Sequence, residues 1–208
     1  MTNPVVCFDL GNVLVKLRFD RCVRELCRLG NRDYRAVRGQ TPPFFDEHGL
    51  ALSCGALGAD AFLDRLAGQF GVGHLDRGVV AGAWCAIFDP WPEMESVAQA
   101  AVTSGAAVWL LSNTDPMHFA YIHAKMPVLD DFSGWHLSYE IGANKPDRVY
   151  YERFFATAEV DPGDCVFFDD RPENVEAARS LGMDAVLFAG DVAAARNKLR
   201  SIGLAVAL

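Results

Sequence analysis

The sequence has no long hydrophobic run, no internal repeat and no low-complexity segment. No apolar stretch approaches the length of about 20 residues that a membrane-spanning helix needs. Between Met1 and the apolar run that starts at Pro4 there is neither a basic segment nor a cleavage site. We therefore expect a cytoplasmic protein that does not bind membranes.

Cysteine occurs six times but never in a CxxC pair, so a redox or zinc motif of that kind is excluded. A chain of 208 residues, 51% hydrophobic and 22% charged, can bury a core without disulfides, and it is neither disordered nor collagen-like. We expect reduced, buried thiols at Cys7, Cys22, Cys27, Cys54, Cys85 and Cys165.

Basic residues are fewer than acidic ones. The 19 lysines and arginines and the 27 aspartates and glutamates give a net charge of −8. An acidic surface repels polyphosphate, so we expect no nucleic acid among the partners. A small anionic substrate is compatible with this charge if local groups supply positive charge. Nothing in the sequence indicates an oligomeric state.

The second half of the chain alternates short apolar runs with helical patterns. This order predicts a doubly wound parallel α/β sheet, to which an N-terminal strand at residues 4–8 would belong. Further strands are expected at 106–111, 135–139, 165–168 and 185–188. Helices are expected at 91–104, 146–158, 173–181 and 192–202.

The segment between residues 16 and 89 shows helical spacing instead. Helices are expected at 19–38, 59–70 and 77–88, and Thr41-Pro42-Pro43 is expected to break the pattern. So long a segment exceeds a simple crossover in a sheet. We therefore predict a discontinuous core of residues 1–15 and 90–208, with residues 16–89 forming an inserted helical cap.

Polar residues follow three of the expected strands: Asp9, the pair Ser112 and Asn113, and the pair Asp169 and Asp170. The carboxyl ends of parallel strands lie side by side, which is where open α/β sheets bind ligands. Adjacent carboxylates repel one another unless a cation or a proton relieves them. Three aspartates in this place therefore predict a Mg²⁺ site.

Four segments resemble the four motifs of the haloacid dehalogenase (HAD) superfamily, in the order that this family has them. They are residues 8–14 (FDLGNVL), 110–114 (LLSNT), 145–147 (KPD) and 167–174 (FFDDRPEN). The match spans nearly the whole chain. The variants are most similar to a branch that includes bacterial α-D-glucose-1-phosphatase and the phosphatase domain of soluble epoxide hydrolase, as are Trp84, residues 88–90 (FDP) and residues 92–93 (PE).

The resemblance implies a Mg²⁺-dependent phosphomonoester hydrolase in which Asp9 attacks phosphorus and forms an aspartyl-phosphate. Asp170 would be the chief metal ligand, supported by Asp9, Asp169 and the backbone carbonyl of Gly11. A small sugar phosphate, such as a hexose 1-phosphate, is the substrate expected from the branch.

The remaining motif residues would bind or orient the phosphate. Ser112 and Asn113, together with the loop at Gly11 and Asn12, would contact its oxygens. Lys145 would balance charge in the transition state and orient Asp9. Asn174 would stabilise the metal site by contacting its ligands without binding the metal itself.

The chain departs from the family pattern two positions after Asp9. Most phosphatases of the family carry an aspartate there as general acid and base, whereas this chain has Gly11, followed by Asn12. Loss of such a group slows catalysis by about 10²–10⁴-fold. We therefore expect slow turnover unless the leaving group is good, as an anomeric sugar oxygen is, or another residue substitutes.

Substrate choice is expected to come from residues of the helical segment that face Asp9. Our candidates are Phe44, Phe45, Glu47 and His48, with His48 as a substitute acid. We expect Arg171 to face solvent.

Three alternatives stay open. A haloacid dehalogenase shares Asp9 and Lys145 and lacks the second acid, but it needs no metal, so Asp169 and Asp170 would lack a purpose. A weakly active or non-catalytic phosphate-binding protein would explain Gly11. A response-regulator receiver is disfavoured because its acidic pair precedes its lysine along the chain, whereas here Lys145 comes first.

Overall fold

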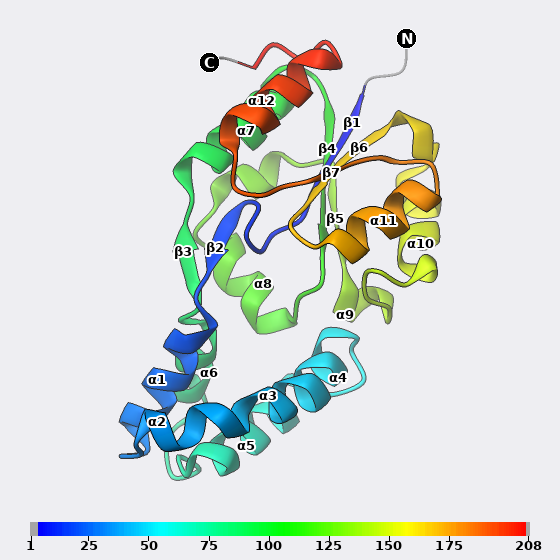
Figure 1. Ribbon diagram of the computed structural model, residues 1–208. Helices are drawn as coiled ribbons and strands as arrows, with labels where there is room; N and C mark the ends of the chain where they lie inside the picture. Colours follow the sequence, from blue (N-terminus) through cyan, green and yellow to red (C-terminus); the bar gives the residue numbers. More distant parts are fainter. Residues whose placement is uncertain (1–3, 207–208) are drawn as a thin grey trace.

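The computed structural model describes residues 4–206. Residues 1–3 and 207–208 lie outside the described part. The expectation that no leader precedes the first strand concerns residues 1–3, so it lies outside the described residues. Five strands form one parallel sheet in the order β5-β4-β1-β6-β7 (Figure 1). They are β1 (Val5–Phe8), β4 (Ala107–Ser112), β5 (Gly134–Leu137), β6 (Cys165–Asp169) and β7 (Asp184–Leu187).

Alternate residues of the strands face opposite layers of helices. Val6 and Phe8 pack into a cluster with α7 (Pro92–Thr103), α8 (Pro116–His123) and α12 (Val192–Ser201). Val5 and Cys7 face the other side, where α10 (Arg148–Ala158) and α11 (Pro172–Ser180) cover the sheet. Because both faces are buried, the strands read as continuous apolar runs. The predicted doubly wound fold is confirmed.

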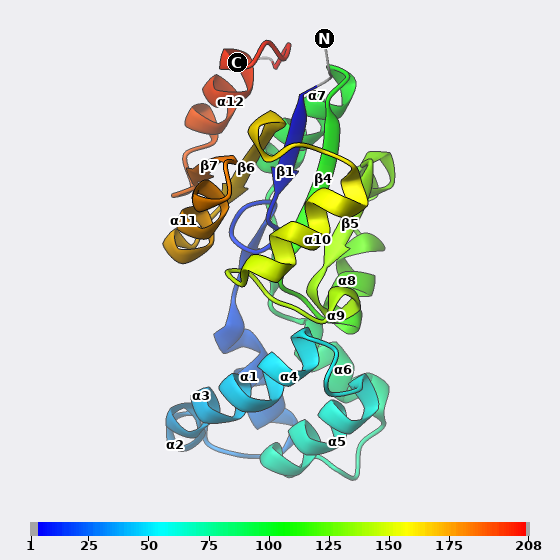
Figure 2. The same ribbon diagram turned by 90° about the vertical axis from the view of Figure 1, so that its right-hand side faces the viewer.

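A group of helices between residues 19 and 85 surrounds a second hydrophobic cluster of its own. Figure 2 shows these helices at one end of the sheet. They are α1 (Phe19–Leu29), α2 (Tyr34–Val37), α3 (Thr41–Phe44), α4 (Leu50–Ser53), α5 (Ala59–Phe70) and α6 (Arg77–Cys85). The remaining helical elements are the 3₁₀-helices η1 (Arg38–Gln40), η3 (Pro127–Asp131) and η4 (Pro162–Asp164) and the π-helix η2 (Phe45–Gly49).

An antiparallel ribbon joins this helical part to the sheet. It pairs β2 (Val15–Leu17) with β3 (Phe88–Pro90), so that Leu17 lies opposite Phe88. The ribbon contains both expected boundaries, at residues 16 and 89. The division into a core and a cap stays a prediction, and the separate hydrophobic cluster of the helical part supports it.

Several element boundaries differ from the sequence expectations. The single helix expected at 19–38 ends at Leu29, and the prolines of 41–43 do not break helical structure, because they stand in the first turn of α3, where no backbone N–H is needed. The helix expected at 77–88 ends at Cys85, and β3 follows it. The strand expected at 135–139 gives way to α9 (Ser138–Ile141), and α8 was missed.

All six cysteines are free; five are buried, and Cys54 is partly exposed. Among the described residues, every helix is too short or too polar to cross a membrane.

Candidate active site

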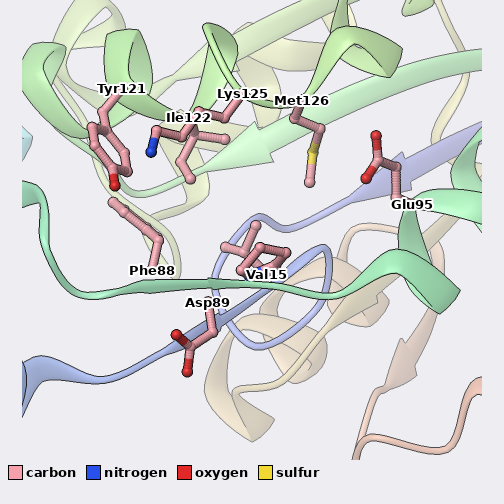
Figure 3. A pocket seen from close by; sticks show the side chains of 9 residues that line it. Val15, Phe88, Asp89, Glu95, Tyr121, Ile122, Lys125 and Met126 are labelled. Atoms are coloured by element: carbon pink, nitrogen blue, oxygen red, sulfur yellow. The ribbon is translucent and has the colours of Figure 1, made fainter.

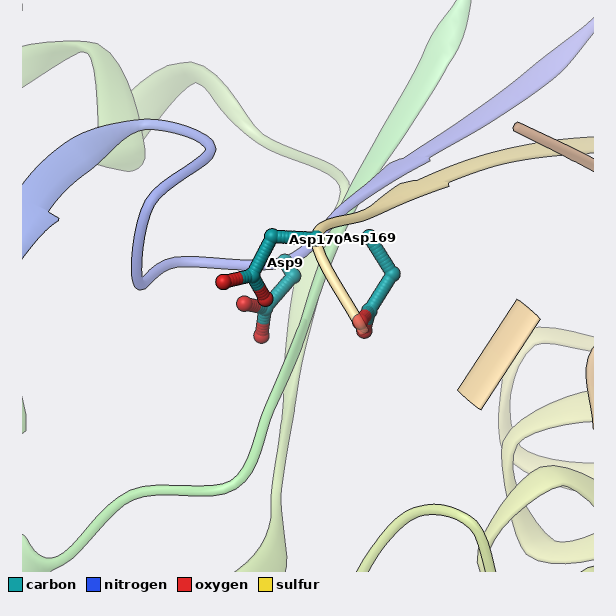
Figure 4. A group of neighbouring side chains, drawn as sticks. All are labelled: Asp9, Asp169 and Asp170. Atoms are coloured by element: carbon teal, nitrogen blue, oxygen red, sulfur yellow. The ribbon is translucent and has the colours of Figure 1, made fainter. Parts of the chain in front are cut away.

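Three carboxylates meet where β1 and β6 end (Figure 4). Asp9 directly follows β1, Asp169 is the last residue of β6, and Asp170 follows it. One carboxylate oxygen from each lies within 4.8 Å of the others. Asp9 and Asp169 are buried, whereas Asp170 is partly exposed. The sheet therefore assembles the acidic cluster that the strand ends predicted.

Lys145 supplies the positive charge of this cluster. Its Nζ atom donates hydrogen bonds to Asp9 Oδ1, to Asp169 Oδ2 and to the carbonyl oxygen of Leu111, each at 2.7 Å. Burial alone would lower the pKa of Lys145, but the two carboxylates outweigh burial and raise it. The ammonium group is therefore held in its charged form between Asp9 and Asp169.

The surroundings of Asp9 disfavour its ionised form. Burial raises its pKa to about 7, Lys145 opposes the shift, and the charges of Asp169 and Asp170 add to it. A cation bound beside Asp9 would favour the ionised form, which is the form that can act as a nucleophile.

Asp169 is fully buried, and the protein saturates its oxygens. Besides Lys145, it accepts from the backbone N–H of Arg171 at 2.9 Å and from Asn174 Nδ2 at 2.9 and 3.1 Å. These contacts fix both the carboxylate and the lysine that it binds.

Asn12 orients Asp170 from the loop that follows β1. Its backbone has the left-handed φ of 54°, its Nδ2 donates to Asp170 Oδ2 at 2.9 Å, and its Oδ1 accepts from the N–H of Leu17 at 3.1 Å. A short polar side chain tolerates this backbone conformation better than a bulky one. Asn12 thus connects the acidic cluster to β2.

The side chain of Asn113 binds the backbone of Lys145, an interaction that the sequence did not indicate. Its Nδ2 donates to the carbonyl of Lys145, and its Oδ1 accepts from the N–H of the same residue, both at 2.8 Å. The side-chain amide therefore clamps the backbone that carries the lysine. Ser112, expected beside it as a phosphate ligand, is buried as the last residue of β4.

A cavity of about 240 Å³ opens at the acidic cluster. Arg171, at its rim, is exposed as expected, and its side chain pairs with Glu173. The lining includes every site residue predicted from the four motifs except Ser112 and Asp169, and it adds two apolar side chains that the sequence did not indicate. It consists of Asp9, Gly11, Asn12, Leu17, Phe19, Asn113, Lys145, Asp170, Arg171 and Asn174.

The four candidates from the helical part are not among these lining residues, and their role in substrate choice stays a prediction. Phe45 stacks on Trp84 with the ring centroids 5.7 Å apart, and Phe44 packs edge-on against His48 at 4.7 Å. His48 Nδ1 lies 3.1 Å from an Arg65 nitrogen, while Glu47 is exposed. Phe44 and Phe45 pack against aromatic neighbours here, and the role of His48 as a substitute acid stays a prediction.

The donor set fits Mg²⁺, which prefers oxygen ligands and keeps several bound waters. Asp9 and Asp170 supply charged oxygens, and Asp169, whose oxygens the protein binds, adds negative charge beside them. Asn174 Oδ1 adds an observation of its own, since it belongs to a residue that lines the cavity yet is buried without a hydrogen-bond partner within residues 4–206. A metal-bound water would satisfy this acceptor.

A smaller cavity, of about 90 Å³, lies beside the ribbon (Figure 3). Val15, Phe88 and Asp89 of the ribbon line it together with Glu95 of α7 and with Lys125, which follows α8. Its charged groups are Asp89, Glu95 and Lys125, and none of Asp9, Asp169 and Asp170 lines it. The chemistry is therefore assigned to the cavity at the acidic cluster.

The fold and the cavity at the acidic cluster define an α/β enzyme whose centre combines three carboxylates with one buried lysine. The chain belongs to the haloacid dehalogenase-like hydrolases, because the model of that family matches residues 4–182. D-ribitol-5-phosphate phosphatase of Bacteroides thetaiotaomicron is 26% identical over 187 residues, which cover 86% of this chain and 88% of that protein. Phosphatase MT3486 of Mycobacterium tuberculosis is 31% identical over 192 residues, which cover 90% and 88%.

Solved structures agree on the fold. A HAD family enzyme of Bacteroides thetaiotaomicron, in complex with magnesium and inorganic phosphate, superposes with a TM-score of 0.80 at 23% identity, covering 91% of this chain and 96% of that one. The L-2-haloacid dehalogenase of Xanthobacter autotrophicus superposes with a TM-score of 0.64 at 16% identity, covering 100% and 85%. At these identities the likeness concerns the fold alone.

Proposed function

We propose that this phosphatase of the HAD-like family hydrolyses small phosphomonoesters through an aspartyl-phosphate on Asp9. The observation that carries the proposal is the contact of 2.7 Å between Lys145 Nζ and Asp9 Oδ1, inside a cluster of three carboxylates. Mg²⁺ would be held by Asp9 and Asp170 with the carbonyl of Gly11, and when bound it would neutralise the phosphoryl oxygens. The relatives named phosphatases, and the magnesium and phosphate complex of a protein with the same fold, support it.

The geometry divides the tasks of Asp9. Lys145 binds Oδ1, which leaves Oδ2 to attack phosphorus. The new O–P bond forms as the bond to the leaving alcohol breaks, and the electron pair leaves on the alcohol oxygen. Since Gly11 carries no acid, that oxygen takes its proton from water. A second water then attacks phosphorus, which releases phosphate and regenerates Asp9.

Asp169, Asn113 and Asn174 are proposed to act as positioning residues. Asp169 and Asn113 hold the side chain and the backbone of Lys145, respectively, and Asn174 fixes Asp169. The role predicted for the Ser112 and Asn113 segment as a phosphate ligand stays part of this proposal. The helical part, residues 16–89, is proposed as a cap over the cavity.

The substrate is proposed to be a small phosphorylated sugar or polyol. The branch resemblance favours a hexose 1-phosphate, and the relative named D-ribitol-5-phosphate phosphatase favours a pentitol phosphate. An anomeric oxygen is the better leaving group of the two, which suits an enzyme with glycine at position 11.

The deciding experiment measures phosphate release from α-D-glucose 1-phosphate, D-ribitol 5-phosphate and nucleoside monophosphates, with Mg²⁺ and with a chelator. We expect release from at least one small substrate, loss of activity with chelator, and loss in Asp9→Asn. Asp164→Asn, an exposed carboxylate outside the cavity, is the matched control and should retain activity. Phosphate release that persists in Asp9→Asn would remove the nucleophile, and chloride release from 2-chloropropionate without metal would favour the dehalogenase alternative.

A further inference from the structure

One wall of the otherwise polar cavity is apolar. It consists of Leu17, the last residue of β2, and Phe19, the first residue of α1. Phe19 is 55% exposed, which is unusual for a large aromatic side chain in a domain that buries most of its others. Apolar side chains left exposed beside a few polar groups are typical of a surface that contacts a ligand.

The backbone alternation from Lys16 to Phe19 explains why this wall is uncharged. Leu17 and Phe19 face the cavity of Asp9, whereas Lys16 and Arg18 line a neighbouring cavity. Each cation has a partner away from Asp9. Lys16 Nζ lies 4.5 Å from the centroid of the Trp91 ring, and Arg18 Nε lies 3.2 Å from an Asp89 oxygen.

The rim offers no free cation either. Arg171 is the positive group that lines the cavity at its exposed side, and its Nε donates to Glu173 Oε1 at 2.8 Å. Lys145 is buried and bound to Asp9 and Asp169. A second anionic group on the substrate would therefore find no unpaired positive charge among the lining residues.

We infer that Leu17 and Phe19 select substrates whose leaving group is a single uncharged ring, with one face of the ring stacked on Phe19. This rests on the proposed function, since the phosphate must lie at Asp9. The cavity of about 240 Å³ lies just below the range of drug-sized sites, which leaves room for a phosphate and one ring.

A ring suits this wall better than an open chain. It presents a continuous C–H or π face without the loss of several rotatable bonds on binding. An acyclic polyol would have to turn hydroxyl groups toward Phe19, and burying them without partners is unfavourable. The wall therefore separates hexose 1-phosphates and aryl phosphates from pentitol and glycerol phosphates.

Phe19→Ala tests the inference with two classes of substrate. Phenyl phosphate and glucose 1-phosphate carry rings, while glycerol 3-phosphate and D-ribitol 5-phosphate do not. We expect KM for the ring substrates to rise roughly 3- to 10-fold, the size of an aromatic stacking contact, with kcat within about twofold because the contact is equal in the ground and transition states. KM for the acyclic substrates should stay within about twofold.

Two further variants serve as controls. Phe19→Tyr should restore the wild-type KM for the ring substrates. Val79→Ala, which shortens another exposed apolar side chain, on α6, should change KM for neither class.

A binding measurement makes the test independent of turnover. With Mg²⁺ present, calorimetry should show that wild type binds phenylphosphonate more tightly than methylphosphonate and that Phe19→Ala abolishes the difference. An equal effect of Phe19→Ala on both substrate classes, or wild type without a preference for phenylphosphonate, would overturn the inference. Failure of the proposed function has a different signature, namely no phosphate release by wild type or release that survives Asp9→Asn.

Discussion

Leu17 fills the space into which a side chain at position 11 would project. A Cβ atom added to Gly11 would lie 2.6 Å from Leu17 Cδ1 and 3.2 Å from Leu17 Cγ, both closer than ordinary van der Waals contact. A side chain at position 11 would therefore meet the apolar wall of the cavity, and Leu17 would have to turn aside for it. Glycine at 11 and leucine at 17 are matched to each other, and a substitution at one position depends on the other.

This pairing predicts how a general acid could be introduced. Gly11→Asp alone should gain little, because the new side chain must first displace Leu17. In a Leu17→Ala background, the same change should raise kcat by at least about tenfold for substrates with poor leaving groups, since a positioned acid contributes about 10²–10⁴-fold. Steady-state kinetics on glycerol 3-phosphate for the two single variants and the double variant measure the coupling. A double variant no faster than Leu17→Ala would show that proton transfer does not limit the rate.

Lys145 should be needed for folding as well as for catalysis. Lys145→Met keeps much of the side-chain volume but leaves Asp9 and Asp169 buried together without a cation. Removing one partner of a buried ion pair costs about 3–5 kcal/mol, so we expect a loss of that order in the free energy of unfolding at pH 7.5, together with loss of activity.

Lys198→Met is the matched control for that prediction. Lys198 pairs with Asp184 near the surface, where an ion pair contributes about 1 kcal/mol or less. Urea denaturation of the two variants measures the difference. Equal stabilities would mean that Asp9 and Asp169 relax or take up protons at little cost.

The sequence predicted the sheet and the centre of the site because both depend on local pattern and parallel topology. Strands buried on two faces leave continuous apolar runs, and the residues that follow them must gather at one edge. Asp9, Asp169 and Asp170 accordingly lie where their strands end. Lys145 has no such local signal, and its place rested on the resemblance to the HAD motifs.

Features set by contacts between distant segments could not be predicted. The pairing of Leu17 with Phe88 joins two three-residue strands far apart in the sequence, too short for a periodic pattern. The same pairing brings Phe19 to the cavity. His48 and its neighbours carry site-like residue types, but the aromatic packing of the helical part decided their positions.

Magnesium affinity should depend on pH through Asp9. Its pKa is about 7 in the absence of metal, because burial and the neighbouring carboxylates outweigh Lys145. Below that pH, a proton must leave before Mg²⁺ binds, so the apparent Kd should rise up to about tenfold for each unit that the pH falls. Above it, the Kd should be nearly constant. Calorimetric titration of metal-free protein between pH 5.5 and 8.5 measures the slope, and Asp9→Asn should flatten it. A pH-independent Kd in the wild type would contradict the assignment of Asp9 as a ligand.

Asp115 should be the main polar contact that holds the helical part against the sheet domain. Its Oδ1 caps α8 by accepting from the N–H groups of Met117 and His118, and its Oδ2 accepts from Trp84 Nε1 of α6 at 3.1 Å. The same oxygen lies 2.8 Å from His118 Nδ1. Asp115→Ala removes a helix cap, worth about 1 kcal/mol, and buried hydrogen bonds to a charged group, worth about 1.5–3 kcal/mol. We therefore expect a loss of about 3 kcal/mol in the free energy of unfolding at pH 7.

The pH dependence separates the contribution of the Asp115 charge from that of packing. Burial raises the pKa of Asp115, but the interactions with His118 and Trp84 outweigh burial and hold it below the usual range. Because the folded pKa is depressed, the carboxylate stabilises the fold above the unfolded pKa of about 3.9, and this contribution is lost as the pH falls through the folded value. The stability difference between wild type and Asp115→Ala should therefore shrink below pH 4. The difference for Trp84→Phe should change less with pH, because that substitution removes a neutral indole N–H and part of a buried ring but no charge. Denaturation curves at pH 7 and pH 3.5 measure both differences. If the loss of unfolding free energy in Asp115→Ala is the same at both pH values, the loss comes from packing alone.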